Sequence, residues 1–204
     1  MGSQSWIGRA DLAALACPYC GRMADPNGEA AVAAEREWGF VGAGLALDGV
    51  RTAALLITPI PDTRAAMLSC LWVAPGQVGR GRGRRLVQAA AAGLLSHDVE
   101  AIVARGSRTK ADCAAPPVDF LRAVGFSRGV DARLYSSLRA GGGAPRLGHP
   151  SDLDDARLSR LWQLDLTTTV TMPEGLRGMV DRWLRALGPI RPEPAGRVTR
   201  NGES

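Results

Sequence analysis

The sequence predicts an α/β (α+β) domain, in which helices pack against a sheet. The apolar run Met67–Val73 is typical of a buried strand, and a glycine-rich segment at 79–83 follows it. From about Gly83 onward, leucine, valine and alanine recur at helical spacing. Asp48-Gly49 lies between two further strand patterns, which is the signature of a hairpin. Strands and helices that alternate in this way pack as layers around one core.

Size and composition fit one globular domain. A chain of 204 residues is long enough to bury a sizeable core. Its hydrophobic content of 46% and charged content of 22% are ordinary for a folded protein. The formal net charge of +5 favours anionic partners, such as phosphates, nucleic acid or an acidic protein surface. Lys110 is the only lysine, so arginine carries nearly all of the positive charge, as a GC-rich coding sequence would also produce.

The first residues and the cysteines predict a cytoplasmic protein. Residues 1–7 contain no apolar segment of the kind that a signal peptide has. No apolar run approaches the length of a membrane span, so no membrane partner is expected. Four cysteines in a chain of this length are typical of a reducing compartment rather than of a disulfide framework.

The N-terminal part predicts a short helix over about 9–15 and then a tight turn. The turn Cys17-Pro-Tyr-Cys20-Gly21 resembles half of a zinc knuckle. A structural zinc site needs two more ligands, and the chain has no second Cys-x-x-Cys. We therefore favour ordinary thiols in a turn and expect no metal, while a redox role for the two thiols stays open.

Helix and strand patterns follow in order. Asp25-Pro-Asn-Gly28 has turn chemistry, and residues 29–38 then predict a helix with one apolar face. Strands are predicted at 40–47 and 51–60, on either side of the hairpin turn. A helix to about His97 follows the glycine-rich segment.

The second half of the chain predicts a strand at 99–104, a loop at 106–117 and a helix at 118–124. We expect another strand from Gly125 to about Leu138, and a last strand at 160–170. Residues 172–187 predict an amphipathic helix whose apolar face is a core contact or a homodimer contact.

The glycine-rich segment has the chemistry of an anion site. Gly79, Gly81 and Gly83 let backbone N–H groups approach a ligand closely. The helix behind them adds unpaired N–H groups and a positive dipole end. Arginines between the glycines can bind phosphate oxygens with two N–H groups each. A solvated turn and a nucleic-acid patch are the alternatives, and no Lys-Ser/Thr pair follows that would complete a Walker loop.

Two segments carry a family resemblance. Val73-x-Pro75, with Gly79-Arg-Gly-Arg-Gly83 and Leu86, resembles the acetyl-CoA pyrophosphate loop of the GNAT superfamily of N-acetyltransferases. Asp119–Phe126, a short helix that ends in Gly-Phe, resembles the second GNAT signature. The early Cys-x-x-Cys and Glu37-Trp-Gly are similar to features of a set of actinobacterial GNAT proteins. The resemblance covers 11–139 well and the rest loosely.

The resemblance implies a mixed, mostly antiparallel sheet flanked by helices, with the acetyl-CoA loop between a central strand and a helix. It implies a core over 1–139, and it favours an enlarged loop over 140–156, rather than a linker to a separate tail, before a completing strand and helix over 157–188. The glycines and proline at 140–145 predict that this loop is flexible, and the residues after Gly188-Pro189 predict a disordered tail over 189–204. A splay between the strands at 67–74 and 99–104 would admit the pantetheine arm.

The resemblance also implies residues that bind acetyl-CoA, the acyl donor. They are Leu71, Trp72, Val73, Val78, Gly79, Arg80, Gly81, Arg82, Gly83, Arg84 and Phe120. Backbone N–H groups over 72–74 would polarise the thioester. The chain departs from the family pattern at Val78, where arginine or glutamine is usual, and at Leu121, where tyrosine is usual.

The expected function is acetyl transfer to a primary amine, either a protein lysine or a small molecule. Glu37 is the candidate base, ahead of Glu35 and Asp119, and Tyr135 or a water is the candidate acid. The alternative is a non-catalytic acyl-CoA-binding regulatory protein. Nucleic-acid binding is disfavoured, because aromatics make up only 5% of the chain and are not interleaved with the arginines.

Overall fold

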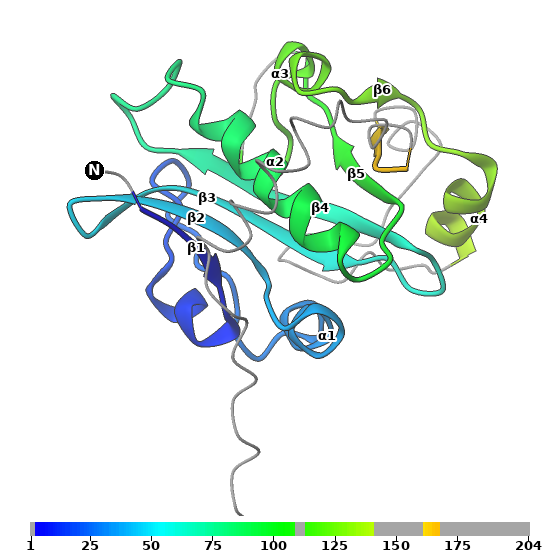
Figure 1. The fold of residues 1–204 in the computed structure, drawn as a ribbon, viewed down its shortest axis with the longest axis horizontal. Helices are drawn as coiled ribbons and strands as arrows, with labels where there is room; N and C mark the ends of the chain where they lie inside the picture. The colour runs from blue at the N-terminus through cyan, green and yellow to red at the C-terminus, as the bar shows by residue number, and fades with distance from the viewer. Residues whose placement is uncertain (1–2, 109–112, 141–160, 168–204) are drawn as a thin grey trace, which may run out of the picture.

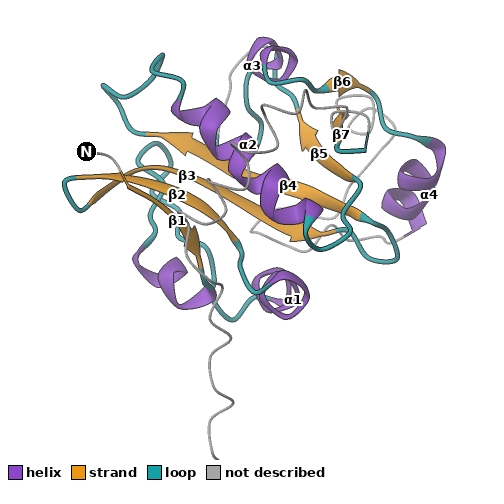
Figure 2. Cartoon of the chain, in the orientation of Figure 1, coloured by secondary structure: helices purple, strands orange, loops and turns teal. Residues whose placement is uncertain are grey.

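In the computed structural model the chain forms a single sheet with helices on both faces (Figure 1). The structure describes residues 3–108, 113–140 and 161–167. The strands are β1 (Ser3–Ile7), β2 (Gly42–Leu47), β3 (Val50–Pro59), β4 (Ala65–Val73), β5 (Ala101–Arg105), β6 (Ser127–Arg128) and β7 (Leu161–Asp165). The helices are the 3-10 helix η1 (Arg9–Ala14) and the α-helices α1 (Glu29–Trp38), α2 (Arg82–Leu95), α3 (Val118–Ala123) and α4 (Ala132–Ala140) (Figure 2).

The sheet is mixed and mostly antiparallel, as predicted. Its seven described strands lie in the order β1-β2-β3-β4-β5-β7-β6. The parallel pair among them is β4 with β5, joined through α2. The other neighbouring strands run antiparallel. A parallel pair needs a crossover, and the helix predicted behind the glycine-rich segment is that crossover.

The predicted hairpin is confirmed. Asp48 and Gly49 both have positive φ, 50° and 79°, which is the backbone of the turn that joins twisted antiparallel strands without splaying them. β1 was not predicted, because Ser3, Gln4 and Ser5 give it no apolar pattern. It is a strand because its backbone pairs with β2.

Two clusters of apolar side chains lie on opposite faces of the sheet. Ala66 and Leu68 of β4 belong to the larger cluster, which contains the buried side of α2. Ala65 and Met67 belong to the smaller one, with Leu134 of α4. Successive residues of a strand face opposite sides, so α2 and α4 cover opposite faces of β4 and β5.

The strand predicted from Gly125 to Leu138 is wrong beyond its first residues. Only Ser127–Arg128 pair with β7, and Gly129 then turns the chain with φ 95°. The Asp131 carboxylate accepts hydrogen bonds from the N–H groups of Arg133 and Leu134, at 3.0 and 2.9 Å. Capping of this kind begins a helix, so the segment forms α4 instead.

The last predicted strand is present as β7, between β5 and β6. The helix predicted at 172–187, most of the predicted loop at 140–156 and the predicted tail lie outside the described residues. None of the helices in the described part has the length and apolar character that crossing a lipid bilayer requires.

Candidate functional site

β4 and β5 separate halfway along β4, as the resemblance predicted. Their parallel pairing ends at Leu68, opposite Ala104. The register with β3 shifts at the same place, because Leu56 pairs with Cys70 while Ile57 pairs with Leu68, which makes Ser69 the extra residue of a β-bulge. From Ser69 onward β4 stays paired with β3, and its other edge faces away from β5.

The loop after β4 has the backbone of an anion site. Gly76, Gly79 and Gly81 have φ of 78°, 78° and 72°, a region that residues with a Cβ rarely adopt. A Cβ at any of the three would meet no described atom within 4 Å, so the loop is open on the outside. Gly81 is the N-cap of the 14-residue α2, whose first N–H groups have no partner within the helix.

Two of the predicted arginines brace the loop. Arg82 donates from Nε to Gln77 Oε1 at 3.0 Å and from a terminal nitrogen to Thr52 Oγ1 at 3.3 Å. Arg84 donates to the carbonyl of Ala123, at the end of α3, at 2.9 Å. Both guanidinium groups are therefore engaged within the protein.

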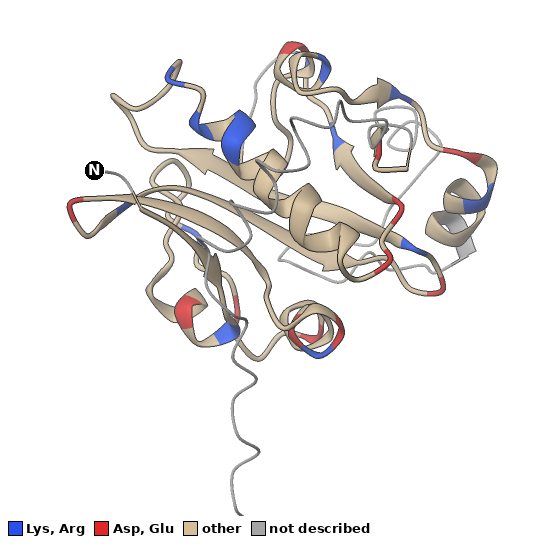
Figure 3. Cartoon of the chain, viewed as in Figure 1, with Lys and Arg blue, Asp and Glu red and all other residues tan. Residues whose placement is uncertain are grey.

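Arg80 and Arg85 have their whole guanidinium groups open to a ligand. Both are exposed, and within the described residues neither side chain makes a hydrogen bond or ion pair. Figure 3 shows basic residues gathered on the loop and on the first turn of α2. Val78, also predicted to bind the cofactor, is 65% exposed on this loop.

Gly83 and Phe120 form the contact between α2 and α3. A Cβ on Gly83 would lie 3.0 Å from the Phe120 ring, so a glycine there lets the two helices approach. Phe120 is half-buried against the larger core cluster. The two predicted binding residues thus fix the start of α2 relative to α3.

The free edge of β4 is partly occupied by the chain itself. The N–H of Leu71 donates to the carbonyl of Cys113 at 2.6 Å, and the Tyr19 hydroxyl donates to the carbonyl of Val73 at 2.5 Å. The N–H of Ala74 donates to Thr52 of β3 at 2.8 Å. Because N–H groups alternate along an antiparallel strand, the N–H of Val73 points to the splay side.

A cavity of about 320 Å³ lies beside this edge. The buried Trp72 forms part of its wall, together with the bulge residue Ser69. The Ser69 hydroxyl is buried and has no hydrogen-bond partner among the described residues. Asp25 also lines the cavity, which the sequence did not indicate because Asp25-Pro-Asn-Gly is ordinary turn chemistry.

The predicted acid and base residues lie elsewhere. Glu37 is exposed near the end of α1 and is not among the lining residues of this cavity. The Glu35 carboxylate binds Arg9 at 2.8 Å, and Asp119 is exposed beside Arg122 at 3.5 Å. Tyr135 packs against the smaller core cluster, which contains the other end of β4.

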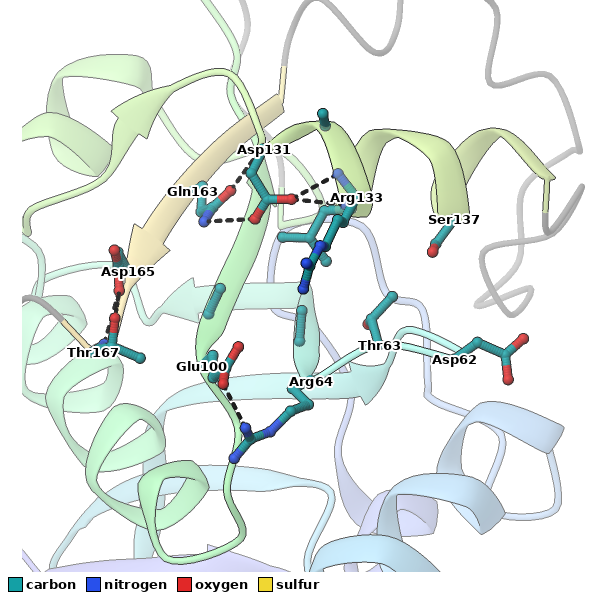
Figure 4. A pocket seen from close by; sticks show the side chains of 14 residues that line it. Asp62, Thr63, Arg64, Glu100, Asp131, Arg133, Ser137, Gln163, Asp165 and Thr167 are labelled. Carbon is teal, nitrogen blue, oxygen red and sulfur yellow. Dashed lines mark hydrogen bonds and ion pairs between the residues drawn. The ribbon is translucent and has the colours of Figure 1, made fainter.

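A larger cavity, of about 780 Å³, lies at that other end, between the starts of β4 and β5 and α4 (Figure 4). Four of its charged side chains have partners in the protein. Arg64 pairs with Glu100 at 2.6 Å, Asp131 caps α4, and Asp165 accepts a hydrogen bond from the Thr167 hydroxyl at 2.7 Å. These groups maintain the fold around α4, and none of the predicted site residues lines this cavity.

No protein-family model and no curated protein sequence matches the chain. Solved structures do. The N-acetylglutamate synthase of Neisseria gonorrhoeae, complexed with coenzyme A and N-acetyl-glutamate, is 16% identical over 81% of this chain, with a TM-score of 0.51. The matched region is only 35% of that longer chain.

Two further matches have lower scores. The ribosomal-protein-S18-alanine N-acetyltransferase of Escherichia coli is 16% identical over 81% of this chain and 94% of its own, with a TM-score of 0.48. Tetrahymena GCN5 is 12% identical over 61% of this chain and 67% of its own, with a TM-score of 0.44. The match to the N-acetylglutamate synthase and the order of the seven described strands show that this part of the chain has the fold of the GNAT acetyltransferases.

Proposed function

We propose that the protein is an acetyl-CoA-dependent N-acetyltransferase that acts on a primary amine. The observation that carries the proposal is the loop at 76–83. It presents open, positive-φ glycines at the N-terminus of α2, directly after the splayed half of β4. A pyrophosphate binds such N–H groups, and an extended arm can follow a free strand edge.

In this proposal the donor lies along the loop and the splay. The pyrophosphate accepts hydrogen bonds from the N–H groups of 79–83, with Arg80 and Arg85 closing on it from solvent. The pantetheine arm enters between β4 and β5. The N–H of Val73 points to that side and polarises the thioester carbonyl, where negative charge develops during acyl transfer.

The acceptor amine enters the cavity of about 320 Å³ beside Trp72. Ser69 and Asp25 line this cavity, and their side-chain oxygen atoms can accept hydrogen bonds from the amine. Both a protein lysine and a small amine fit this chemistry. We favour a protein lysine, because no residue of α1 lines this cavity, so the glutamates and the tryptophan of that helix are not placed to hold a small cation there.

The base is tested by two carboxylate variants in a CoA-release assay with a lysine peptide and a small amine. Asp25 lines the cavity and Glu37 does not, so Asp25→Asn should lower kcat/KM by about 100-fold, the scale of general-base catalysis. Glu37→Gln should change it less than about twofold. Asn keeps the oxygen that accepts a hydrogen bond from the N–H of Asn27, so the turn is preserved. Absence of turnover by the wild type with every amine would contradict the enzymatic proposal.

We propose Tyr19 as the acid that protonates the departing thiolate. Its hydroxyl donates a hydrogen bond to the carbonyl of Val73, while Tyr135 packs near the other end of β4. Tyr19→Phe should lower kcat about tenfold or more, with little change in the KM for acetyl-CoA. Tyr135→Phe is the matched control and should keep kcat within about twofold. The reverse ranking of the two variants would return the role to Tyr135.

A second candidate is a non-catalytic acyl-CoA-binding regulatory protein. The observation in its favour is the hydrogen bond from the N–H of Leu71 to the carbonyl of Cys113. This bond occupies one backbone donor of the splayed edge of β4, which is then not available to the pantetheine arm. This function predicts acetyl-CoA binding with no CoA release for any amine. Isothermal titration with acetyl-CoA, together with the CoA-release assay, therefore separates the two functions.

A further inference from the structure

All four cysteines of the chain meet beside the splayed half of β4. Cys17 and Cys20 come from the turn before α1, Cys70 from β4 and Cys113 from the segment after β5. The Sγ atoms of Cys17, Cys20 and Cys113 all lie within 4.8 Å of one another. The thiol of Cys70 is in hydrogen-bonding contact with that of Cys113. Cys20 and Cys113, which are 93 positions apart in the sequence, thus belong to one cluster of thiols.

The sulfur spacing is that of metal ligands. Four thiolates at about 2.3 Å from a tetrahedral zinc ion lie roughly 3.8 Å from one another. The Sγ atoms of Cys20 and Cys113 are 3.6 Å apart. A disulfide would bring two sulfur atoms to about 2.05 Å. The sulfur atoms of Cys17, Cys20 and Cys113 therefore need little rearrangement to surround an ion, and Cys70, which contacts Cys113, moves closer to the other two to complete the site.

The backbone of the first pair is that of a metal-binding knuckle. The N–H of Cys17 donates to the carbonyl of Arg22 and that of Gly21 to the carbonyl of Cys17, both at 2.9 Å. Gly21 closes the turn with φ 66°. The N–H groups of Tyr19 and Cys20 hydrogen-bond to the Cys17 sulfur. Such second-shell donors orient a ligand and stabilise it as a thiolate.

Zinc is bound by the thiolate form of cysteine, so an ion that enters this cluster displaces the thiol protons and pairs with the sulfur atoms.

We propose that Cys17, Cys20, Cys70 and Cys113 bind one structural zinc ion. Four thiolates fill a tetrahedral site and leave no open position, so the ion serves structure rather than chemistry. It joins the turn before α1, the splayed half of β4 and the segment after β5. Cys17, Cys70 and Cys113 also line the proposed acceptor cavity, so the ion lies in its wall. Zinc content is measured without turnover, so failure of the zinc proposal is distinguishable from failure of the proposed function.

The test is the metal content of protein purified under reducing conditions. The wild type should hold about one zinc per chain. Cobalt exchanged into the site should give the tetrahedral d–d bands and the thiolate charge-transfer band of a four-sulfur site. Cys20→Ser, at the exposed ligand, should reduce the zinc content at least tenfold. Tyr19→Phe, in the same turn, should keep it.

Cys70→Ser tests the fourth ligand, and its cobalt spectrum should lose intensity in the thiolate band. An unchanged spectrum would overturn the four-thiolate site. A wild type that contains no zinc, and binds neither added zinc nor cobalt with its four thiols reduced, would overturn the proposal altogether. Circular dichroism of each variant shows whether it is folded, so loss of metal is not confused with loss of fold.

Discussion

Gly81→Glu should weaken acetyl-CoA binding by at least about 100-fold in isothermal titration. Gly81 caps α2 at φ 72°, and the space outside it is open to a ligand. A glutamate there brings negative charge to the N–H groups that are proposed to hold the pyrophosphate. A repulsion of several kcal/mol is expected for such a juxtaposition, and about 2.7 kcal/mol already corresponds to 100-fold.

Gly129→Glu is the matched control. Gly129 also has positive φ, 95°, and also has open space where a Cβ would be, but it lies between β6 and α4. Both variants carry the same added charge and a similar backbone strain, of about 1 kcal/mol. Gly129→Glu should therefore bind acetyl-CoA within about threefold of the wild type. Equal affinities of the two variants would show that the loop does not bind the donor, and a wild type that does not bind would remove the proposed function.

Phe40→Ala should lower the free energy of unfolding by about 3–5 kcal/mol, the cost of removing a large core aromatic. Phe40 is fully buried just before β2. Its ring centroid lies 4.3 Å from that of Trp6, 6.2 Å from that of Trp38 and 5.9 Å from that of His97. It therefore joins β1, the end of α1 and the residues after α2.

Urea unfolding measures this effect, with Val50→Ala as its control. Val50 is an apolar residue that is 67% exposed at the start of β3, so its truncation should cost less than about 0.5 kcal/mol. A loss below about 1 kcal/mol for Phe40→Ala would mean that these aromatic contacts contribute little to the packing of β1 and α1 against the larger core cluster.

The elements predicted correctly are those with a strong local signal. The hairpin at Asp48-Gly49 depends on turn chemistry within a few residues, and α1 on an apolar face that repeats every turn. The glycines of the loop were predicted because positive φ is a property of the single residue. Local rules of this kind do not require knowledge of the rest of the fold.

The missed elements depend on partners far away in the sequence. β1 has a polar pattern and exists because β2 offers its edge. The segment after Gly129 contains residues that suit either a strand or a helix, and the Asp131 cap selects the helix. The hydrogen bonds of Arg82 to Gln77 and of Arg84 to Ala123 were likewise not indicated by any local pattern.

By itself, the sequence determined the layered fold, the glycine-rich loop and its place between β4 and α2, because each follows from patterns along adjacent residues. Only the tertiary structure decided what lies beside the splayed half of β4. It brought Asp25 to the cavity, Tyr19 to the end of β4 and Cys113 to the Cys17–Cys20 turn. The physical reason is that these contacts join residues tens of positions apart, whose approach is set by the packing of whole elements around β4.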